Sequence, residues 1–232
     1  MPNHIILDFD GVLFDSAFEA YQVCQKVTTS IPNLRKNVDY EEFLQFRKYL
    51  TDAWQFNRLY SKFNTISDYT KLNEILPDEE DMNFTQSFFK ARKIIMKNNE
   101  WDKLMIPYKF FFEIKEYIVK YPSLFKILST RNEESITRTL NHNGIHNIQI
   151  AGQEIIRKYS SKLNTAKKLG WLDCKDSFSV YIDDMPDHLV PFQQDVDLLL
   201  QADWGYGEAN EYSCSSDLCS NIIKVLCKSQ CQ

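Results

Sequence analysis

Hydrophobic positions follow two different patterns along the chain. From Pro107 onward, short apolar runs typical of buried strands alternate with segments whose apolar residues recur at helical spacing. Residues 17–105 show the helical spacing alone, with acidic helix starts at Asp39-Tyr40-Glu41-Glu42 and Asp78-Glu79-Glu80. A further apolar run, Ile5-Ile6-Leu7, predicts a strand near the N-terminus. A long helical segment therefore interrupts a chain that otherwise alternates strands and helices.

The alternation is the pattern of βαβ units, in which parallel strands are covered by helices. Besides the N-terminal run, we expect strands at 124–130, 147–152, 178–182 and 197–202. We therefore predict an α/β fold with a Rossmann-like, doubly wound parallel sheet. Residues 1–16 and 106–232 are expected to form this core domain, and residues 17–105 an inserted α-helical domain.

Composition narrows the possible partners. The net charge is −5, and no basic patch of the kind that binds nucleic acid is visible. The N-terminal apolar stretch is too short and too acidic for a signal peptide, and no apolar run is long enough to span a bilayer. We expect a cytoplasmic protein with neither nucleic acid nor membrane as a partner. The sequence makes no prediction of the oligomeric state.

Most of the six cysteines lie close to the C-terminus. We expect reduced thiols, because disulfides are rare in the cytosol and the spacing lacks the paired C-x-x-C of zinc ribbons. Cys227 and Cys231 are four residues apart and can share a helix face, so a metal site stays open as the less favoured alternative. The cysteines concerned are Cys214, Cys219, Cys227 and Cys231.

The N-terminal strand ends in two carboxylates, Asp8 and Asp10, followed by Gly11. Residues two apart in a strand point to the same side, so the two carboxylates would lie together at the strand's C-terminal end. Neighbouring carboxylates repel each other unless they share a proton or bind a divalent cation. The segment therefore predicts a metal-dependent acidic site. The alternative is an Asx-type turn, because Asp and Gly are common turn residues.

Other predicted strands end in polar side chains as well. One ends in Ser129-Thr130, another in Asp183-Asp184, and Lys162 follows Ser160-Ser161 at a helix start. Since the carboxyl ends of parallel strands meet at one edge of a sheet, these residues can share a pocket with the N-terminal acids. Taken alone, either hydroxyl is as well explained by a helix N-cap.

Four segments in this order resemble the four motifs of phosphatases of the haloacid dehalogenase (HAD) superfamily. They are Asp8-Phe9-Asp10-Gly11-Val12, Ile127-Leu128-Ser129-Thr130-Arg131, a lysine ahead of the last βα unit, and Tyr181-Ile182-Asp183-Asp184. The loop Trp204-Gly205-Tyr206-Gly207 resembles that of phosphoglycolate phosphatase-like members. The helical insertion matches the position of the family's C1 cap, which implies that its residues choose the substrate.

The resemblance implies a role for each motif. Asp8 matches the nucleophile that becomes an aspartyl phosphate. Asp10 matches the general acid that protonates the leaving oxygen and then activates water, and its main-chain carbonyl matches a Mg²⁺ ligand. Ser129 matches the hydroxyl that hydrogen-bonds the transferring phosphoryl group, with Thr130 as the competing register.

The cation and the remaining ligands are less sharply assigned. Lys162 matches the family's lysine, and Lys158 is its rival. Asp183 and Asp184 are both candidate metal ligands, and Asp184 is the first choice. If Asp184 binds the metal directly, Asp183 would act beside it by holding the lysine. Mg²⁺ suits this oxygen-rich set.

Outside these motifs, the resemblance gives weaker assignments. Asp187 is a weak candidate, because the family's further aspartate falls one residue later, where this chain has His188. Four cationic side chains of the helical segment are candidates for binding a substrate carboxylate or a second phosphate. The more ordinary interpretation is that each is a solvated residue on the surface of its helix. They are Arg47, Arg58, Lys62 and Arg92.

Together these features predict an enzyme, a Mg²⁺-dependent hydrolase of phosphoric monoesters. Its partner would be a small phosphorylated metabolite such as phosphoglycolate, a sugar phosphate or a nucleotide. Two alternatives stay open: a phosphomutase with the same chemistry, and a non-catalytic binding or regulatory module that keeps the fold.

Overall fold

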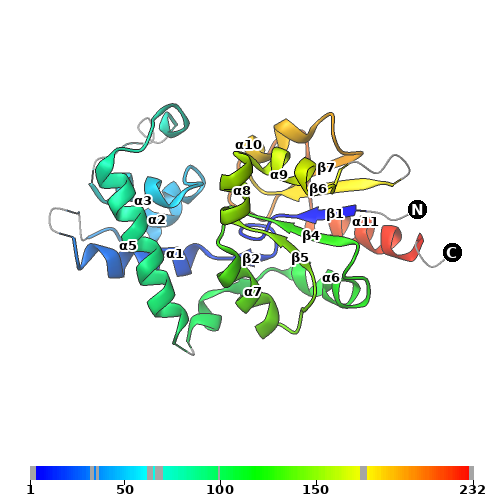
Figure 1. Cartoon of the computed structure of the whole chain (residues 1–232), viewed down its shortest axis with the longest axis horizontal. Helices are drawn as coiled ribbons and strands as arrows, with labels where there is room; N and C mark the ends of the chain where they lie inside the picture. The colour runs from blue at the N-terminus through cyan, green and yellow to red at the C-terminus, as the bar shows by residue number, and fades with distance from the viewer. Residues whose placement is uncertain are drawn as a thin grey trace. The chain divides into compact units, whose positions relative to one another are not determined.

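The computed structural model describes residues 4–31, 34, 37–61, 65, 70–98, 100–172 and 177–229. It divides into two compact units. The first, which we call the α/β unit, comprises Met1–Asp15 and Ile106–Gln232, and the second, the helical unit, comprises Ser16–Met105. The helical unit is thus inserted into the chain of the α/β unit, and Figure 1 colours both by residue number.

A six-stranded sheet forms the centre of the α/β unit, in the order β5-β4-β1-β6-β7-β8 with parallel pairing throughout. The central strand β1 pairs with β4 on one side, Ile5 with Phe125, and with β6 on the other, Ile5 with Val180. The strands are β1 (His4–Leu7), β4 (Phe125–Leu128), β5 (Gln149–Ala151), β6 (Ser179–Asp183), β7 (Leu198–Ala202) and β8 (Ser213–Cys214). This confirms the predicted parallel α/β sheet. Only β8 was not expected.

Helices alternate with these strands and surround the sheet (Figure 1). On one face, Ile6 of β1 and Tyr181 of β6 belong to an apolar cluster with Ala166, Leu189 and Phe192. The helices are α6 (Lys109–Lys120), α7 (Glu133–His142), α8 (Gln153–Tyr159), α9 (Lys162–Lys168), α10 (Pro186–Leu189) and α11 (Ser216–Lys228), with a 3₁₀ turn η3 (Val190–Phe192). Gly144 follows the end of α7 with a φ of 75°, a left-handed conformation that suits glycine.

Two short strands mark where the chain leaves and re-enters the α/β unit. Strand β2 (Phe14–Asp15) runs antiparallel to β3 (Ile106–Pro107), with Phe14 opposite Pro107 and Asp15 opposite Ile106. The backbone N–H of Tyr108 donates to the carbonyl of Leu13 at 3.0 Å. The two crossings are therefore held together as a ribbon.

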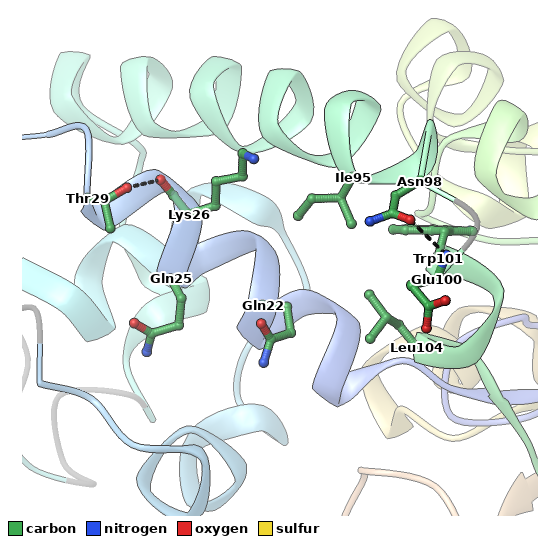
Figure 2. A pocket seen from close by; sticks show the side chains of 9 residues that line it. All are labelled: Gln22, Gln25, Lys26, Thr29, Ile95, Asn98, Glu100, Trp101 and Leu104. Atoms are coloured by element: carbon green, nitrogen blue, oxygen red, sulfur yellow. Dashed lines mark hydrogen bonds between the residues drawn. The ribbon is translucent and has the colours of Figure 1, made fainter.

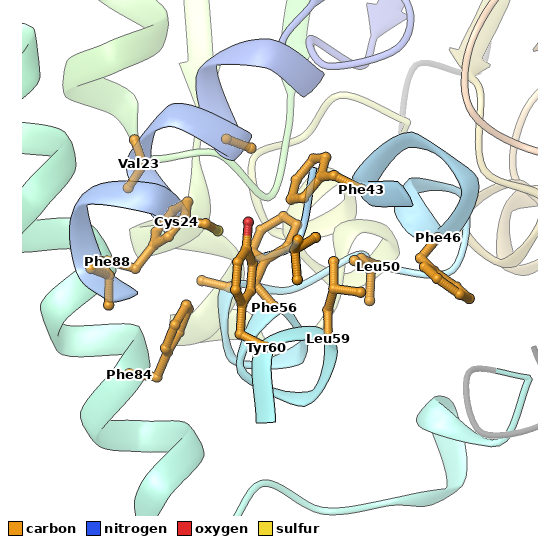
Figure 3. Packing of buried hydrophobic residues seen from close by; sticks show 14 of the residues in the cluster. Val23, Cys24, Phe43, Phe46, Leu50, Phe56, Leu59, Tyr60, Phe84 and Phe88 are labelled. Carbon is orange, nitrogen blue, oxygen red and sulfur yellow. The ribbon is translucent and has the colours of Figure 1, made fainter. Parts of the chain in front are cut away.

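The helical unit packs its helices around an aromatic core. Phe43, Phe56, Tyr60, Phe84 and Phe88 are all buried there, as Figure 3 shows, and the rings of Phe56 and Phe88 stack with centroids 5.4 Å apart. Its elements are α1 (Ala17–Thr28), α2 (Tyr40–Arg47), α3 (Ala53–Ser61), η1 (Leu72–Glu74), α5 (Glu79–Met96) and η2 (Trp101–Leu104). Burial of this apolar surface is the main source of the unit's stability.

The predicted helix starts carry the expected caps. Asp39 accepts a hydrogen bond from the Glu42 N–H at 2.8 Å at the start of α2. Asp78 and Asp81 form a reciprocal capping box at the start of α5.

None of the helices within the described ranges is long and apolar enough to cross a membrane.

Two cations of this unit are buried in ion pairs, so their interpretation as solvated helix residues was wrong. Arg92 binds the buried Glu19 carboxylate through two nitrogens, each at 2.9 Å. Arg58 pairs with Asp81, and with Asp78 at 3.1 Å. Of the other two, Arg47 donates to the Leu50 carbonyl at 2.6 Å, and Lys62 lies outside the described residues.

The following cysteines within the described residues are buried and form no disulfide: Cys24, Cys214, Cys219 and Cys227. Burial raises the pKa of the Cys219 thiol strongly, with the neighbouring Cys214 adding to the effect. Such thiols are poor nucleophiles because the thiolate is scarce. Cys231 lies outside the described residues, so the proposed Cys227–Cys231 metal site stays a prediction.

Candidate active site

The predicted site residues gather where the strands of the α/β unit end. Asp8 directly follows β1, and its N–H donates to the carbonyl of Ile182 on β6 at 2.9 Å, which continues the ladder beyond the strand. Its side chain is buried, and one carboxylate oxygen accepts the N–H of Phe9 at 2.7 Å. The other oxygen lies 2.9 Å from Nζ of Lys162.

Lys162 is the cation at the centre of this cluster. Its Nζ lies 2.9 Å from Asp8, 2.7 Å from Asp183 and 3.2 Å from Nδ1 of His188. The residue opens α9, whose first turn is capped by the Ser161 hydroxyl. Lys158 instead is exposed on α8, with its Nζ over the ring of the adjacent Tyr159. Lys162 rather than Lys158 thus reaches the acids.

The two acids on Lys162 differ in their surroundings. Burial alone would raise the pKa of Asp183, but Lys162 and His188 outweigh it and hold the pKa well below its ordinary value. Asp183 also accepts the Tyr181 hydroxyl and the N–H of Met185. Asp8 has fewer donors, so burial raises its pKa despite the opposing effect of Lys162.

Burial and the neighbouring charges also determine the pKa of Lys162, and both act on it with the opposite sign. Burial alone would lower its pKa, yet the carboxylates of Asp183 and Asp8 outweigh burial and raise the pKa above the ordinary lysine value. The lysine is therefore held in its charged form, and it neutralises one of the two buried acids beside it.

Asp8, Asp183 and His188 bring potential ligand atoms within 4.8 Å of one another, close enough to hold a metal ion. However, the Lys162 ammonium contacts all three groups. A metal ion among these three would have to displace the lysine and face its positive charge. We therefore interpret this cluster as the binding place of the Lys162 ammonium.

Asp184 borders a different, glycine-lined position beside the turn after Asp8. A Cβ at Gly11 would lie 2.2 Å from Oδ2 of Asp184, and one at Gly205 would lie 2.3 Å from its Cβ. The N–H of Tyr206 donates to Oδ2 at 2.8 Å. The carboxylate thus packs against bare backbone, and its oxygens are hard donors of the kind that Mg²⁺ and other hard divalent cations prefer.

Asp10 is held by a cation of its own. Nε of Arg131 lies 2.9 Å from both carboxylate oxygens of Asp10. Arg131 is buried in the loop after β4, where its carbonyl accepts the N–H of Gln153 at 2.9 Å. The arginine therefore fixes the orientation of the Asp10 carboxylate.

Comparisons with known proteins address the fold. No family model matches the sequence, and no curated protein matches it. Among solved structures, a haloacid dehalogenase-like family hydrolase from Streptococcus pneumoniae superposes with a TM-score of 0.61 at 14% identity, covering 97% of this chain and 98% of that chain. A predicted phosphoglycolate phosphatase from Haemophilus somnus gives 0.61 at 12% identity, covering 96% and 97%. β-Phosphoglucomutase from Clostridium difficile gives 0.58 at 15% identity, covering 99% of both chains.

The chain has the haloacid dehalogenase-like fold. The similarity extends over both units and nearly the whole length of each neighbour. It confirms, for the fold, the resemblance that the motifs indicate.

Within this HAD-like fold the two candidate hydroxyls occupy different environments. Ser129 is fully buried, and its N–H donates to the Ala151 carbonyl at 3.1 Å, so it still belongs to the strand ladder. Its Oγ accepts the N–H of Arg131 at a long 3.4 Å. Thr130 is partly exposed. The choice between them as phosphoryl ligand stays a prediction.

The loop after β7 braces the turn that carries the N-terminal acids. Nε1 of Trp204 donates to the Val12 carbonyl at 3.0 Å, and the Tyr206 hydroxyl donates to Asp15 at 2.8 Å. The Trp204 ring also packs on Phe110 with centroids 4.9 Å apart. This loop therefore fixes both Asp184 and the segment that follows Asp10.

Sequence reasoning gave no role to three residues that the structure brings to the site: Arg131, Tyr181 and His188. Arg131 stood inside a quoted motif, two residues after Ser129, and that position was the available signal. His188 was noted only as a departure from the family pattern, yet its ring, and not Asp187, belongs to the cluster around Lys162.

Proposed function

We propose that this chain is a Mg²⁺-dependent phosphatase that hydrolyses a small phosphomonoester through an aspartyl phosphate on Asp8. The observation that carries the proposal is the buried Asp8 at the end of the central strand, 2.9 Å from the charged Lys162. The phosphatases and hydrolases among the structural neighbours support the same class of reaction.

Asp8 acts as the nucleophile. One of its carboxylate oxygens attacks phosphorus, and the bond between phosphorus and the ester oxygen breaks, which leaves the phosphoryl group on Asp8. Lys162 limits the negative charge that accumulates when a phosphate dianion approaches this buried carboxylate. Asp183 keeps the lysine in place from the other side.

Asp10 serves both halves of the reaction. It gives a proton to the departing ester oxygen, and it then takes a proton from the water that attacks phosphorus and releases inorganic phosphate and free Asp8. Arg131 orients the Asp10 carboxylate for both transfers, because its Nε is equidistant from the two oxygens. Ser129 or Thr130 donates a hydrogen bond to the phosphoryl group.

Mg²⁺ would be held by Asp8, the main-chain carbonyl of Asp10, and Asp184. When bound, it neutralises charge on the phosphoryl oxygens. The glycine-lined position of Asp184 supports this choice of ligand. Asp183 is engaged by Lys162, so we assign it to the lysine rather than to direct coordination of the metal.

Phosphate release from a panel of phosphorylated metabolites tests the proposal. The panel includes phosphoglycolate, sugar phosphates, nucleotides and a generic aryl phosphate, each with Mg²⁺ and with a chelator in its place. We expect release from at least one compound, dependent on Mg²⁺ and lost in Asp8→Asn. No release from any compound would overturn the proposal in favour of a non-catalytic module.

A phosphomutase is the second candidate, supported by the similarity to β-phosphoglucomutase. The same panel separates the two reactions. A mutase would convert one sugar phosphate into its isomer when a bisphosphate primes Asp8, with little free phosphate formed. A phosphatase would release phosphate in proportion to the substrate consumed.

A further inference from the structure

The Lys162 ammonium has three N–H groups, and three acceptors surround it. Its Nζ lies 2.7 Å from Asp183, 2.9 Å from Asp8 and 3.2 Å from Nδ1 of His188. A lysine donates at most three hydrogen bonds and accepts none. Within the described residues, these contacts therefore use the whole donor capacity of the ammonium.

The surroundings of His188 indicate which of its ring nitrogens carries hydrogen. Nδ1 lies 3.2 Å from Nζ of Lys162 and 3.3 Å from Oδ1 of Asp183. A hydrogen on Nδ1 would face the ammonium, so that two donors would meet at hydrogen-bonding distance. Oδ1 of Asp183 also accepts the N–H of Met185 at 2.9 Å. We therefore expect the tautomer with hydrogen on Nε2, in which Nδ1 accepts from Lys162.

A phosphoryl group at Asp8 would need a hydrogen bond from the same ammonium, so one of the three contacts must give way. Release of Asp183 would leave a fully buried carboxylate without its lysine, which is costly. The contact with His188 is the longest of the three, and it ends on an uncharged ring nitrogen. The His188 side chain is also 20% exposed, so water can replace the lysine as its donor. His188 is thus the acceptor that yields at least cost.

Building on the proposed phosphatase function, we propose that His188 is a positioning residue that acts through Lys162. It holds the third N–H of the ammonium in the free enzyme and yields that N–H to an oxygen of the substrate's phosphoryl group. Only hydrogen bonds are exchanged in this step, and no proton leaves the lysine. His188 therefore competes with the phosphoryl group for the lysine, and it takes the ammonium back when phosphate leaves.

Nitrogen-15 NMR of the full chain with labelled histidines tests the exchange without turnover. The spectra are recorded with Mg²⁺ at pH 8, above the ordinary histidine pKa of about 6.5. We expect Nδ1 of His188 to be unprotonated and hydrogen-bonded in the free enzyme. Saturating inorganic phosphate should shift its signal toward that of a hydrated ring nitrogen, and His188→Asn identifies the signal by its loss. A hydrogen on Nδ1 in the free enzyme, or no change with phosphate, would overturn the proposal.

Calorimetric titration with inorganic phosphate, in the presence of Mg²⁺, measures the competition. His188→Leu removes the competing acceptor, so phosphate should bind about three- to tenfold more tightly, as expected for one net hydrogen bond. His188→Asn keeps an acceptor, because the amide oxygen can take the place of Nδ1, and its Kd should stay within about twofold of the wild type. A merely structural role of His188 would instead weaken binding in both variants. Circular dichroism verifies that both keep the fold.

Phosphate bound away from the site is distinguished by a second lysine. A groove of about 490 Å³ in the helical unit has Lys26 of α1 in its wall, as Figure 2 shows. Lys26→Met is the control and should leave the Kd of phosphate unchanged. Loss of binding in Lys26→Met would overturn the proposal, as would a wild type that binds no phosphate or a His188→Leu variant that binds it no more tightly.

Turnover of the metabolite panel is measured separately, so the two ideas fail independently. Release of phosphate from a substrate, with unchanged phosphate affinity in His188→Leu, would remove the role of His188 and keep the phosphatase. The expected shift of the His188 signal and the tighter binding in His188→Leu, without turnover of any compound, would keep the competition for Lys162 and remove the phosphatase.

Discussion

Lys162→Met removes the only cation that bridges Asp8 and Asp183 within the described residues. Each contact, at 2.9 Å and 2.7 Å, amounts to about 6 kcal/mol of attraction at an effective dielectric constant of about 20. Desolvation of the buried ions offsets most of this attraction. The net loss in the free energy of unfolding depends on how the variant accommodates the two carboxylates that no longer have a cation beside them.

The variant loses the least stability when it protonates one of the two carboxylates. At pH 7 this costs about 4 kcal/mol for an aspartate of ordinary pKa, in the range of about 3–5 kcal/mol for breaking a buried ion pair. At pH 5 the same protonation costs about 1.5 kcal/mol. The destabilisation caused by Lys162→Met should therefore shrink as the pH falls from 7 to 5.

Urea unfolding of the wild type and of Lys162→Met at both pH values measures this difference. Lys158→Met is the control, because Lys158 is exposed on α8, and it should change the free energy of unfolding little. The double variant Lys162→Met/Asp183→Asn should recover part of the loss, since it removes one uncompensated carboxylate. A loss below about 1 kcal/mol at pH 7, or an equal loss at both pH values, would refute the reasoning.

The remaining predictions concern individual residues of the same site. Asp8→Asn should lower turnover at least about a thousandfold while circular dichroism stays unchanged, and a rate near that of the wild type would remove Asp8 from the mechanism. Arg131→Met should reduce kcat by about 10²-fold or more, because Asp10 loses its orienting partner. The loss should be larger for alkyl than for aryl phosphates, since alkyl leaving groups depend more on protonation by Asp10. Equal losses for both would mean that Arg131 acts on the fold instead. Asp183 has a lowered pKa in the folded state, so its contribution to stability is present above a pH of about 4 and is lost as the pH falls further. Unfolding of the wild type and Asp183→Asn across this acidic range should show a steeper pH dependence for the wild type, whereas parallel curves would contradict the assignment.

The parallel sheet was predictable because each strand except one is a short, nearly continuous apolar run. Strand β8 has only Ser213 and Cys214, which carry no such pattern. It pairs with β7 at the edge of the sheet, where no burial on both faces is required. Its existence depends on tertiary contacts rather than on local sequence.

The acids of the site were predictable for a related reason. Asp8 directly follows β1 and Asp184 directly follows β6. Parallel topology brings the carboxyl ends of such strands to one edge of the sheet. The contact of Arg131 with Asp10 joins residues 121 positions apart and depends on the path of one loop, so no local pattern shows it. Hydropathy patterns also count arginine as a surface residue, which is why the burial of Arg58 and Arg92 was not expected.

The pairing of Asp15 with Ile106 offers a way to shorten the chain. Since the two residues are direct neighbours across an antiparallel ribbon, a two-residue turn such as Asn-Gly can join them and omit residues 16–105. The sheet and the acids around Lys162 all belong to the part that would be kept. A miniature of the α/β unit with a native-like circular dichroism spectrum would then allow the chemistry of its strand ends to be studied apart from the insertion.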